Sequence, residues 1–182
     1  MLLDTPLCDF GAPAPDFRLA DPDGHEVSFD DVVTDKGALV MFICNHCPYV
    51  VAVAERLAAD AKTLQDEGIG VVAIMSNDYE RYPADAPDRM REFAAKYGFT
   101  FAYLVDEDQS VGRAFGAQCT PDFFGYNAHK ELQYRGRLDD ARMGDPSERT
   151  PELLHAMRQI ATTGQGPHEQ QPSMGCSIKW RR

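Results

Sequence analysis

The stretch FICNHCPYV, residues 42–50, holds two cysteines that are separated by two residues, and a proline follows the second cysteine. It overlaps the end of ALVMFIC, residues 38–44, a continuous apolar run typical of a strand that is covered on both faces. Pro48 has no backbone N–H and a φ angle fixed near the helical value, so it suits the first turn of a helix. The two sulfurs are therefore predicted to lie at a strand-to-helix junction.

Such a junction favours reactive thiols. Unpaired backbone N–H groups and the positive end of the helix dipole face the first helical turn, and both favour thiolate over thiol. The spacing of Cys44 and Cys47 also lets their sulfurs bond to each other. His46 could donate a hydrogen bond or lend positive charge to a thiolate, which would make the disulfide a stronger oxidant. The alternative is that His46 is a solvated side chain without such a role.

Length and composition limit the class of protein. The 182 residues suit one compact domain with a tail, and 43% hydrophobic residues are enough for an ordinary core. A net charge of −11 argues against a nucleic-acid binder or a polybasic membrane-surface protein. The first residues have no pattern of a secretory signal, and no window approaches the roughly 18 apolar residues of a membrane span. Five cysteines, an odd number, do not have the spacing of a disulfide-stapled secreted protein. We therefore expect a cytoplasmic protein.

Strand and helix patterns alternate along the chain. The predicted elements are a hairpin over 16–29, a strand over 38–44, a helix over 48–67, a strand over 69–76, a helix over 88–97, a strand over 101–106, a short helix over 109–117, strands over 120–127 and 132–138 joined by a turn at 127–130, and a helix over 151–164. This order predicts an α/β fold with a mixed central sheet and helices on both faces.

The composition changes after Gly164, where a Gly-, Gln- and Pro-rich segment begins. We divide the chain into a domain over 1–164 and a C-terminal tail over 165–182. The end of this tail regains Cys176, Ile178 and Trp180, residues that a purely disordered tail seldom carries. We expect it to dock on the domain.

Further motifs give a specific resemblance. The C-x-x-C motif between a strand and a helix, followed by Thr120-Pro121 before another strand, resembles the thioredoxin superfamily. The N-terminal hairpin is similar to the peroxiredoxin and TlpA/ResA-like branch. Together FICNHCPYV, TPDFF, YRGRLDD and GCSIKW resemble the peroxiredoxin-like thioredoxin-family proteins often labelled AhpC/TSA-type. The resemblance covers essentially the whole chain and implies a thioredoxin-like fold with a cis Thr120-Pro121 peptide beside the dithiol.

The same resemblance implies thiol–disulfide oxidoreduction. By analogy with thioredoxins, Cys44 is the attacking thiolate, nearer the open mouth of the loop, and Cys47 resolves the mixed disulfide. The backbone beside Thr120 and Pro121 would hold a partner's chain in an extended conformation. Protein or small-molecule disulfides and thiols are the expected partners, and no cofactor or metal is required. The His46 argument predicts a redox potential more oxidising than that of a strongly reducing thioredoxin.

A thiol peroxidase is the second hypothesis. Peroxiredoxins carry Pro-x-x-x-Thr-x-x-Cys, and aligning their attacking cysteine on Cys47 puts Cys44 at the Thr position and Val40 at the Pro position. Both departures count against peroxide reduction. The reaction also needs an arginine near the thiolate, for which the candidates are Arg113, Arg135 and Arg137.

Two further hypotheses stay open. Cys44, His46 and Cys47 could ligate zinc with another Cys or His, although no second ligand pair follows at a suitable spacing. The fold could also serve a thiol sensor or binding module without turnover.

Several residues outside the motif have two interpretations each. Cys119 is either a third redox thiol or a small buried residue, and Cys176 is either a resolving or regulatory thiol or a surface cysteine. Asn77 and Asp78 could move protons for the sulfurs, or form a plain turn. Cys8 is expected to have no role, the YPADAP segment to be a surface loop, and Arg137 to pair with Asp139.

Overall fold

The computed structural model describes residues 1–182. Its main sheet has seven strands in the order β3-β2-β6-β5-β4-β8-β9. Their bounds are β2 Arg18–Ala20, β3 Glu26–Ser28, β4 Ala38–Phe42, β5 Gly70–Met75, β6 Ala102–Val105, β8 Asp122–Tyr126 and β9 Leu132–Tyr134. Strands β4, β5 and β6 are parallel, and the other neighbours are antiparallel. The predicted mixed sheet and N-terminal hairpin are confirmed.

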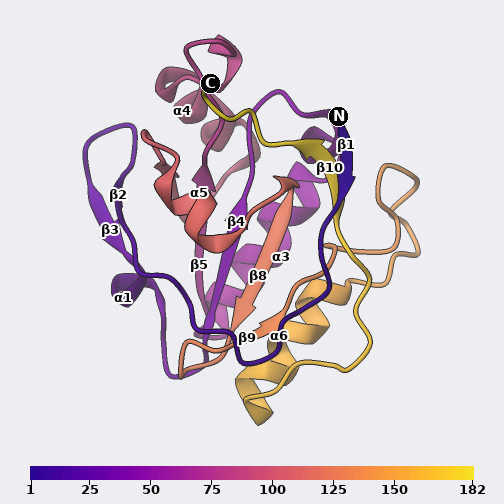
Figure 1. Ribbon diagram of the computed structural model, residues 1–182. Coiled ribbons are helices and arrows are strands. Elements are labelled where there is room, and N and C mark those ends of the chain that lie inside the picture. Colours follow the sequence, from indigo (N-terminus) through magenta and orange to yellow (C-terminus); the bar gives the residue numbers. More distant parts are fainter.

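Helices cover both faces of this sheet (Figure 1). They are α1 Phe29–Val32, α2 Pro48–Val51, α3 Ala54–Asp66, α4 Pro87–Tyr97, α5 Ser110–Phe115 and α6 Glu152–Thr163, with a 3₁₀ turn, η1, at Pro83–Asp85. Residues of α2, α3, α4 and α6 pack in one hydrophobic cluster, and residues of α1 and α5 pack in another. None of these helices combines the length and the apolar character that a membrane-spanning helix needs.

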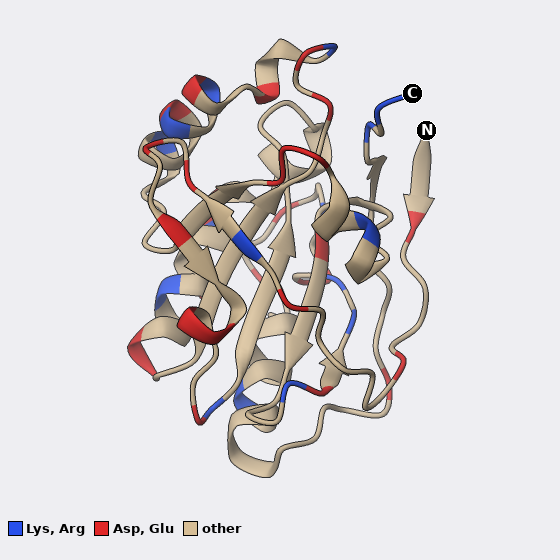
Figure 2. Ribbon diagram, turned by 60° about the vertical axis from the view of Figure 1, so that its left-hand side comes forward, with Lys and Arg blue, Asp and Glu red and all other residues tan.

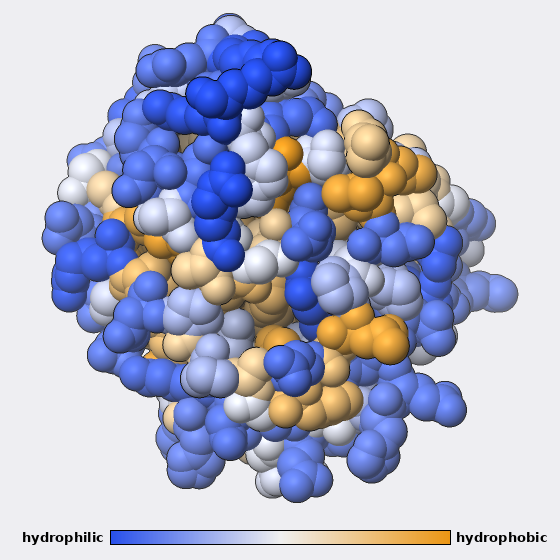
Figure 3. All heavy atoms as spheres, viewed as in Figure 1, coloured by the Kyte–Doolittle hydropathy of each residue, from blue (hydrophilic) through white to orange (hydrophobic).

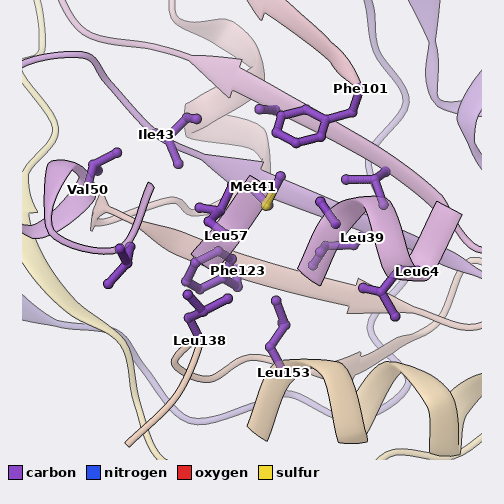
Figure 4. Close-up of a cluster of buried hydrophobic side chains, with 14 of the residues drawn as sticks. Leu39, Met41, Ile43, Val50, Leu57, Leu64, Phe101, Phe123, Leu138 and Leu153 are labelled. Atoms are coloured by element: carbon purple, nitrogen blue, oxygen red, sulfur yellow. The ribbon is translucent and has the colours of Figure 1, made fainter. Parts of the chain in front are cut away.

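Strand β4 is buried on both faces, as its continuous apolar run predicts. Leu39 and Met41 point into the cluster with α3 and α6, where Figure 4 shows them beside Leu57 and Leu153. The alternate residues Ala38, Val40 and Phe42 lie in the cluster on the opposite face. Successive side chains of a strand point to opposite faces, so a strand in the middle of a covered sheet must be apolar throughout.

The single helix predicted over 48–67 is wrong, because the structure has α2 and α3 with a break between them. The amide of Val53 donates to the carbonyl of Val50, only three residues back, at 3.1 Å. The carbonyl of Ala52 accepts a hydrogen bond from the Arg56 guanidinium at 3.2 Å. The tightened turn and this side-chain contact interrupt the regular helical ladder.

A second, three-stranded sheet joins distant parts of the chain. It has the order β1-β10-β7 and consists of β1 Leu2–Asp4, β10 Met174–Ser177 and β7 Cys119–Thr120, all antiparallel. Figure 1 shows β1 in indigo beside β10 in yellow. The tail therefore contributes a strand to this sheet, while the division into 1–164 and 165–182 stays a prediction.

The surface is polar and acidic overall, with local apolar areas. Lys and Arg positions are interspersed with Asp and Glu along the helices and loops (Figure 2). Figure 3 shows orange, hydrophobic surface where β1 lies, and Met1 and Leu2 of that region are 86% and 50% exposed.

Candidate functional site

The C-x-x-C motif lies where the sequence predicts, between β4 and α2. Cys44 follows the end of β4, Cys47 is the residue before the first helical residue of α2, and Pro48 begins that helix. Both cysteines are covered, since Cys44 is 1% exposed and Cys47 is 0% exposed. The open mouth that the resemblance implies beside Cys44 is therefore covered in this structure.

The Thr120-Pro121 peptide is cis, as the resemblance implies, and it lies against both sulfurs. The Sγ atom of Cys44 is 3.4 Å from Thr120 Oγ1. The thiol of Cys47 contacts the Thr120 carbonyl oxygen at 3.3 Å. Antiparallel pairing of β8 with β4, with Asp122 opposite Phe42, brings this loop to the end of β4.

The tail covers the same place. Strand β10 pairs with β7 so that Cys176 is opposite Thr120 and Ser177 is opposite Cys119. The Ser173 hydroxyl donates to the carbonyl of Pro121 at 2.7 Å. The backbone edge expected to hold a partner's extended chain is thus already occupied by the protein's own strand.

The thiols have strongly unequal acidities. Hydrogen bonding from Cys44, followed by the backbone and side chains of Cys176 and Thr120, lowers the pKa of Cys47 to about 4, against the effect of burial. The same hydrogen bond to Cys47, together with burial and the nearby Asp85, raises the pKa of Cys44. Burial and the contact with Cys47 raise the pKa of Cys176. Of the two motif cysteines, Cys47 is the one whose surroundings favour the thiolate.

His46 lies against a buried carboxylate. Its Nδ1 atom is 2.7 Å from Asp85 Oδ2, an ion-pair distance without the directionality of a hydrogen bond. The imidazole is parallel to the ring of Tyr82, with the ring centres 6.0 Å apart. His46 thus faces Asp85 on the Cys44 side of the motif.

Asp85 is the main residue that sequence reasoning missed. It is 0% exposed, although the YPADAP segment was expected to be a plain surface loop. Its Oδ1 accepts from the Asn45 amide at 2.8 Å and its Oδ2 from the Asn77 side chain at 3.0 Å. The first contact anchors the C-x-x-C loop to η1, and the second anchors the segment that follows β5. Nothing local in the sequence distinguishes Asp85 from the other acids of its loop, because its partners lie 40 and 8 residues away.

A metal ion could use part of this cluster. Donor atoms of Cys44, His46 and Asp85 all lie within 4.8 Å of one another, and those of the largely exposed Asp21, Asp23 and His25 do so as well. In the first set both Asp85 oxygens already accept hydrogen bonds from N–H donors. The zinc hypothesis named Cys44, His46 and Cys47 as ligands, whereas the cluster of donor atoms in the structure contains Asp85 in place of Cys47.

Asn77 and Asp78 hold the tail. The amide of Lys179 donates to Asn77 Oδ1 at 2.8 Å, and the amide of Asp78 donates to the Lys179 carbonyl at 2.7 Å. The Asp78 carboxylate lies 3.8 Å from Arg181. The carboxylate that helps to raise the pKa of Cys44 is that of Asp85, not that of Asp78.

The candidate arginines are engaged elsewhere. Arg113 stacks on Trp180 at 4.3 Å, Arg135 pairs with Asp122 at 2.9 Å, and Arg137 pairs with Glu152 at 2.6 Å. The expected Arg137–Asp139 pair is wrong. Asp139 pairs with Arg56 at 2.7 Å and Arg149 at 3.3 Å.

The remaining cysteines have less reactive environments. Cys119 is 0% exposed and burial raises its pKa, which favours the interpretation as a packed residue. Burial also raises the pKa of Cys8 to about 11.

A cavity beside Pro121 is lined by Tyr49, Val53, Phe123, Leu138 and Met174, among others, and it offers an apolar surface next to the dithiol.

Two curated proteins are similar in sequence to part of this chain. Thiol-disulfide oxidoreductase ResA of Halalkalibacterium halodurans is 22% identical over 71% of this chain and 69% of its own length. Peroxiredoxin Bcp of Escherichia coli is 28% identical over 62% of this chain and 67% of its own.

Solved structures agree on the fold. An uncharacterized conserved protein from Geobacillus kaustophilus is 39% identical with a TM-score of 0.93, covering 100% of this chain and 97% of that one. A putative thioredoxin from Neisseria meningitidis is 26% identical with a TM-score of 0.61, covering 82% of this chain and 89% of that one. The fold is therefore thioredoxin-like. The AhpC/TSA family model matches residues 10–138, so the chain belongs to the AhpC/TSA family.

Proposed function

We propose that the protein is a thiol–disulfide oxidoreductase that uses Cys44 and Cys47 as its dithiol/disulfide couple. The observation that carries this proposal is the position of both sulfurs at the junction of β4 and α2, in contact with Thr120 of the cis Thr120-Pro121 peptide. In this pair Cys44 lowers the pKa of Cys47 to about 4. A thiolate next to a protonated thiol is the arrangement that disulfide exchange requires. The similarity to ResA, a thiol-disulfide oxidoreductase by name, supports it.

Cys47 takes the attacking role that the resemblance assigned to Cys44. Its thiolate attacks one sulfur of a partner disulfide, a mixed disulfide forms, and the partner's other sulfur leaves as a thiolate. A second protein thiol then loses its proton and attacks Cys47 Sγ, which releases the partner's remaining sulfur as a thiol. The partner disulfide gains two electrons and the protein gains one disulfide.

His46 and Asp85 are suited to deprotonate Cys44 when it acts as this second thiol. A nitrogen of His46 and an oxygen of Asp85 lie within 4.8 Å of Cys44 Sγ. The His46 side chain is 32% exposed, whereas that of Asp85 is 0% exposed. The imidazole therefore lies where it can pass a proton from the buried thiol to solvent.

The test is to map the cysteines after the reduced protein meets oxidised glutathione. Trypsin places Cys44 and Cys47 in one peptide, 37–56, apart from Cys8, Cys119 and Cys176. We expect peptide 37–56 to carry a disulfide or glutathione on Cys47 within minutes. Cys47→Ser should abolish this reaction, and Cys8→Ser, the matched control, should leave it unchanged. Failure of glutathione to modify Cys47 would refute the proposal.

Peroxide reduction is the second candidate. The covered Cys47 thiolate, directly followed by Pro48, supports it because a small peroxide needs less access than a protein disulfide. The similarity to Peroxiredoxin Bcp also supports it. Cys44 at the expected Thr position and the engaged arginines count against it. Sulfenic acid formation at Cys47 by hydrogen peroxide, faster than reaction with oxidised glutathione, would move this candidate to first place.

Disulfides and thiols are the proposed partners, with peroxide as the alternative, and the cytoplasm is the proposed location. The support for the location is the odd number of cysteines, clustered as catalytic thiols are in reducing compartments.

A further inference from the structure

The tail is built to hold Cys176 in one position over the site. Cys176 lies in the middle strand of a sheet, between Leu2 of β1 and Thr120 of β7. The preceding residue must be small, since a Cβ atom on Gly175 would lie 1.9 Å from the Thr120 carbonyl oxygen. Gly175 thus lets β10 approach the cis-proline loop more closely than any other residue would. This positioning is too specific for a cysteine on a loose tail.

Cys176 and Cys44 flank the same sulfur. The thiol of Cys47 contacts the carbonyl of Thr120 at 3.3 Å, and Thr120 is the residue that pairs with Cys176. Cys176 packs against the hydrophobic cluster that contains both Cys44 and Cys47, and its backbone and side chain help to lower the pKa of Cys47. Cys176 is only partly buried, whereas Cys44 is 1% exposed. The site therefore has one central thiolate with an inner and an outer thiol.

We propose that Cys176 is a third redox residue of this site, which forms a disulfide with Cys47 and then passes it to Cys44. This inference rests on the proposed thiol–disulfide exchange and names the thiol that resolves its mixed disulfide.

Two successive thiol–disulfide exchanges at Cys47 account for both electrons. With Cys47 joined to a partner sulfur, the Cys176 thiol loses a proton and attacks Cys47 Sγ; the Cys47–Cys176 bond forms, and the partner sulfur leaves and takes up a proton. The Cys44 thiol then loses its proton and attacks Cys47 Sγ, so that the Cys44–Cys47 bond forms and Cys176 returns to a thiol. The partner disulfide is the only oxidant, and it has gained two electrons.

Charges favour Cys176 over Cys44 as the first resolving thiol. Both thiols are held protonated partly by the Cys47 thiolate, and this influence disappears when Cys47 enters a mixed disulfide. The groups then left near Cys176 include Lys179 and the N-terminal ammonium, which favour its thiolate. Cys44 keeps its deeper burial and the carboxylate of Asp85, which disfavour its thiolate.

The experiment follows the second exchange in variants. Reduced wild type, Cys44→Ser, Cys176→Ser and the control Cys8→Ser are mixed with oxidised glutathione, quenched with acid, alkylated and digested with trypsin. Cys176 falls in peptide 159–179, so a Cys47–Cys176 bond joins peptides 37–56 and 159–179. Circular dichroism checks that each variant is folded.

We expect Cys44→Ser to accumulate this cross-link and to release the second glutathione molecule as the cross-link forms. Cys176→Ser should keep glutathione on Cys47 and release it more slowly than wild type, because the thiol that remains, Cys44, is more deeply buried and lies near Asp85. Glutathione that stays on Cys47 in Cys44→Ser without a cross-link would overturn the inference while leaving the proposed function intact. So would a cross-link found only in a dimer on a non-reducing gel, or one to peptide 114–130, which holds Cys119. No reaction at Cys47 in any variant would refute the proposed function instead.

Discussion

Replacing Cys44 by alanine should raise the pKa of Cys47, because a hydrogen bond from Cys44 is the largest influence that lowers it to about 4. A hydrogen bond to a charged group contributes about 1.5–3 kcal/mol. One pKa unit corresponds to about 1.4 kcal/mol, so losing this bond should raise the pKa by about 1–2 units. At about pH 5 the thiolate fraction should then fall from about 90% to between about 50% and 10%.

The ultraviolet absorbance of the thiolate measures this titration without requiring a reagent to reach the covered sulfur. Cys47→Ser supplies the background, and Cys44→Ser is the matched control because its hydroxyl can still donate to the thiolate. We expect the midpoint of Cys44→Ser to lie between those of wild type and Cys44→Ala. Circular dichroism over the same pH range separates titration from acid unfolding.

Two results would refute this reasoning. A wild-type midpoint near 8.5, the value of an ordinary thiol, would mean that the neighbours do not stabilise a thiolate. A low midpoint that survives in Cys47→Ser but is lost in Cys44→Ala would place the thiolate on Cys44 and restore the attacking role that the resemblance implies.

Three further changes have expected outcomes. The pKa of Cys47 is lower in the folded protein than in the unfolded chain, so its stabilisation of the reduced fold is complete above about pH 8.5 and is lost as the pH falls through about 4. Relative to Cys47→Ser, the free energy of unfolding measured in urea should therefore rise by about 3 kcal/mol between about pH 5 and 7. A difference between the two proteins that does not change with pH would contradict this prediction. Gly175→Ala should loosen β10 by its clash with Thr120, giving faster amide exchange over 174–177 and unchanged exchange in β5; equal protection of β10 would show that the strand absorbs the methyl group. Asp85→Asn offers one acceptor oxygen to two N–H donors, so it should destabilise the fold by about 1–3 kcal/mol in urea titrations, and wild-type stability would show that Asp85 does not anchor the loop.

The central part of the fold could be predicted because its signals are local. The continuous apolar run of β4, the proline that begins α2 and the glycines that end α4 and α6 each act within a few residues. The order of these elements then restricts the topology to a few sheets. The break between α2 and α3 could not be predicted in this way, because a periodic apolar pattern does not show that the Arg56 side chain donates a hydrogen bond to the Ala52 carbonyl.

The surroundings of the dithiol depend on contacts between distant residues. Strand β7 has two residues and pairs with a strand more than 50 residues later. Its short length and its local sequence therefore do not predict that it forms a strand. The sequence indicates that the segment around Cys176 docks on the domain, but it does not indicate that Cys176 pairs with Thr120. Asp85 likewise acquires its role only when η1 folds against Asn45. The two candidate cysteines could be named from the sequence, whereas the order of their acidity depends on what the tail and η1 place beside them.

The register of β10 changes how a partner can approach. The resemblance implies that the backbone at Thr120 binds an extended partner chain, yet the amide and carbonyl edge of β7 is paired with β10. Lys179, held by Asn77 and Asp78, fixes the tail at its far end. A protein partner must therefore displace β10 to reach Cys47, while a small disulfide or peroxide needs only a local opening there. Reaction with oxidised glutathione should accordingly be much faster than reaction with a folded disulfide protein, and loosening β10 by Gly175→Ala should reduce that difference. If the two substrates react equally fast in wild type, the tail does not control access.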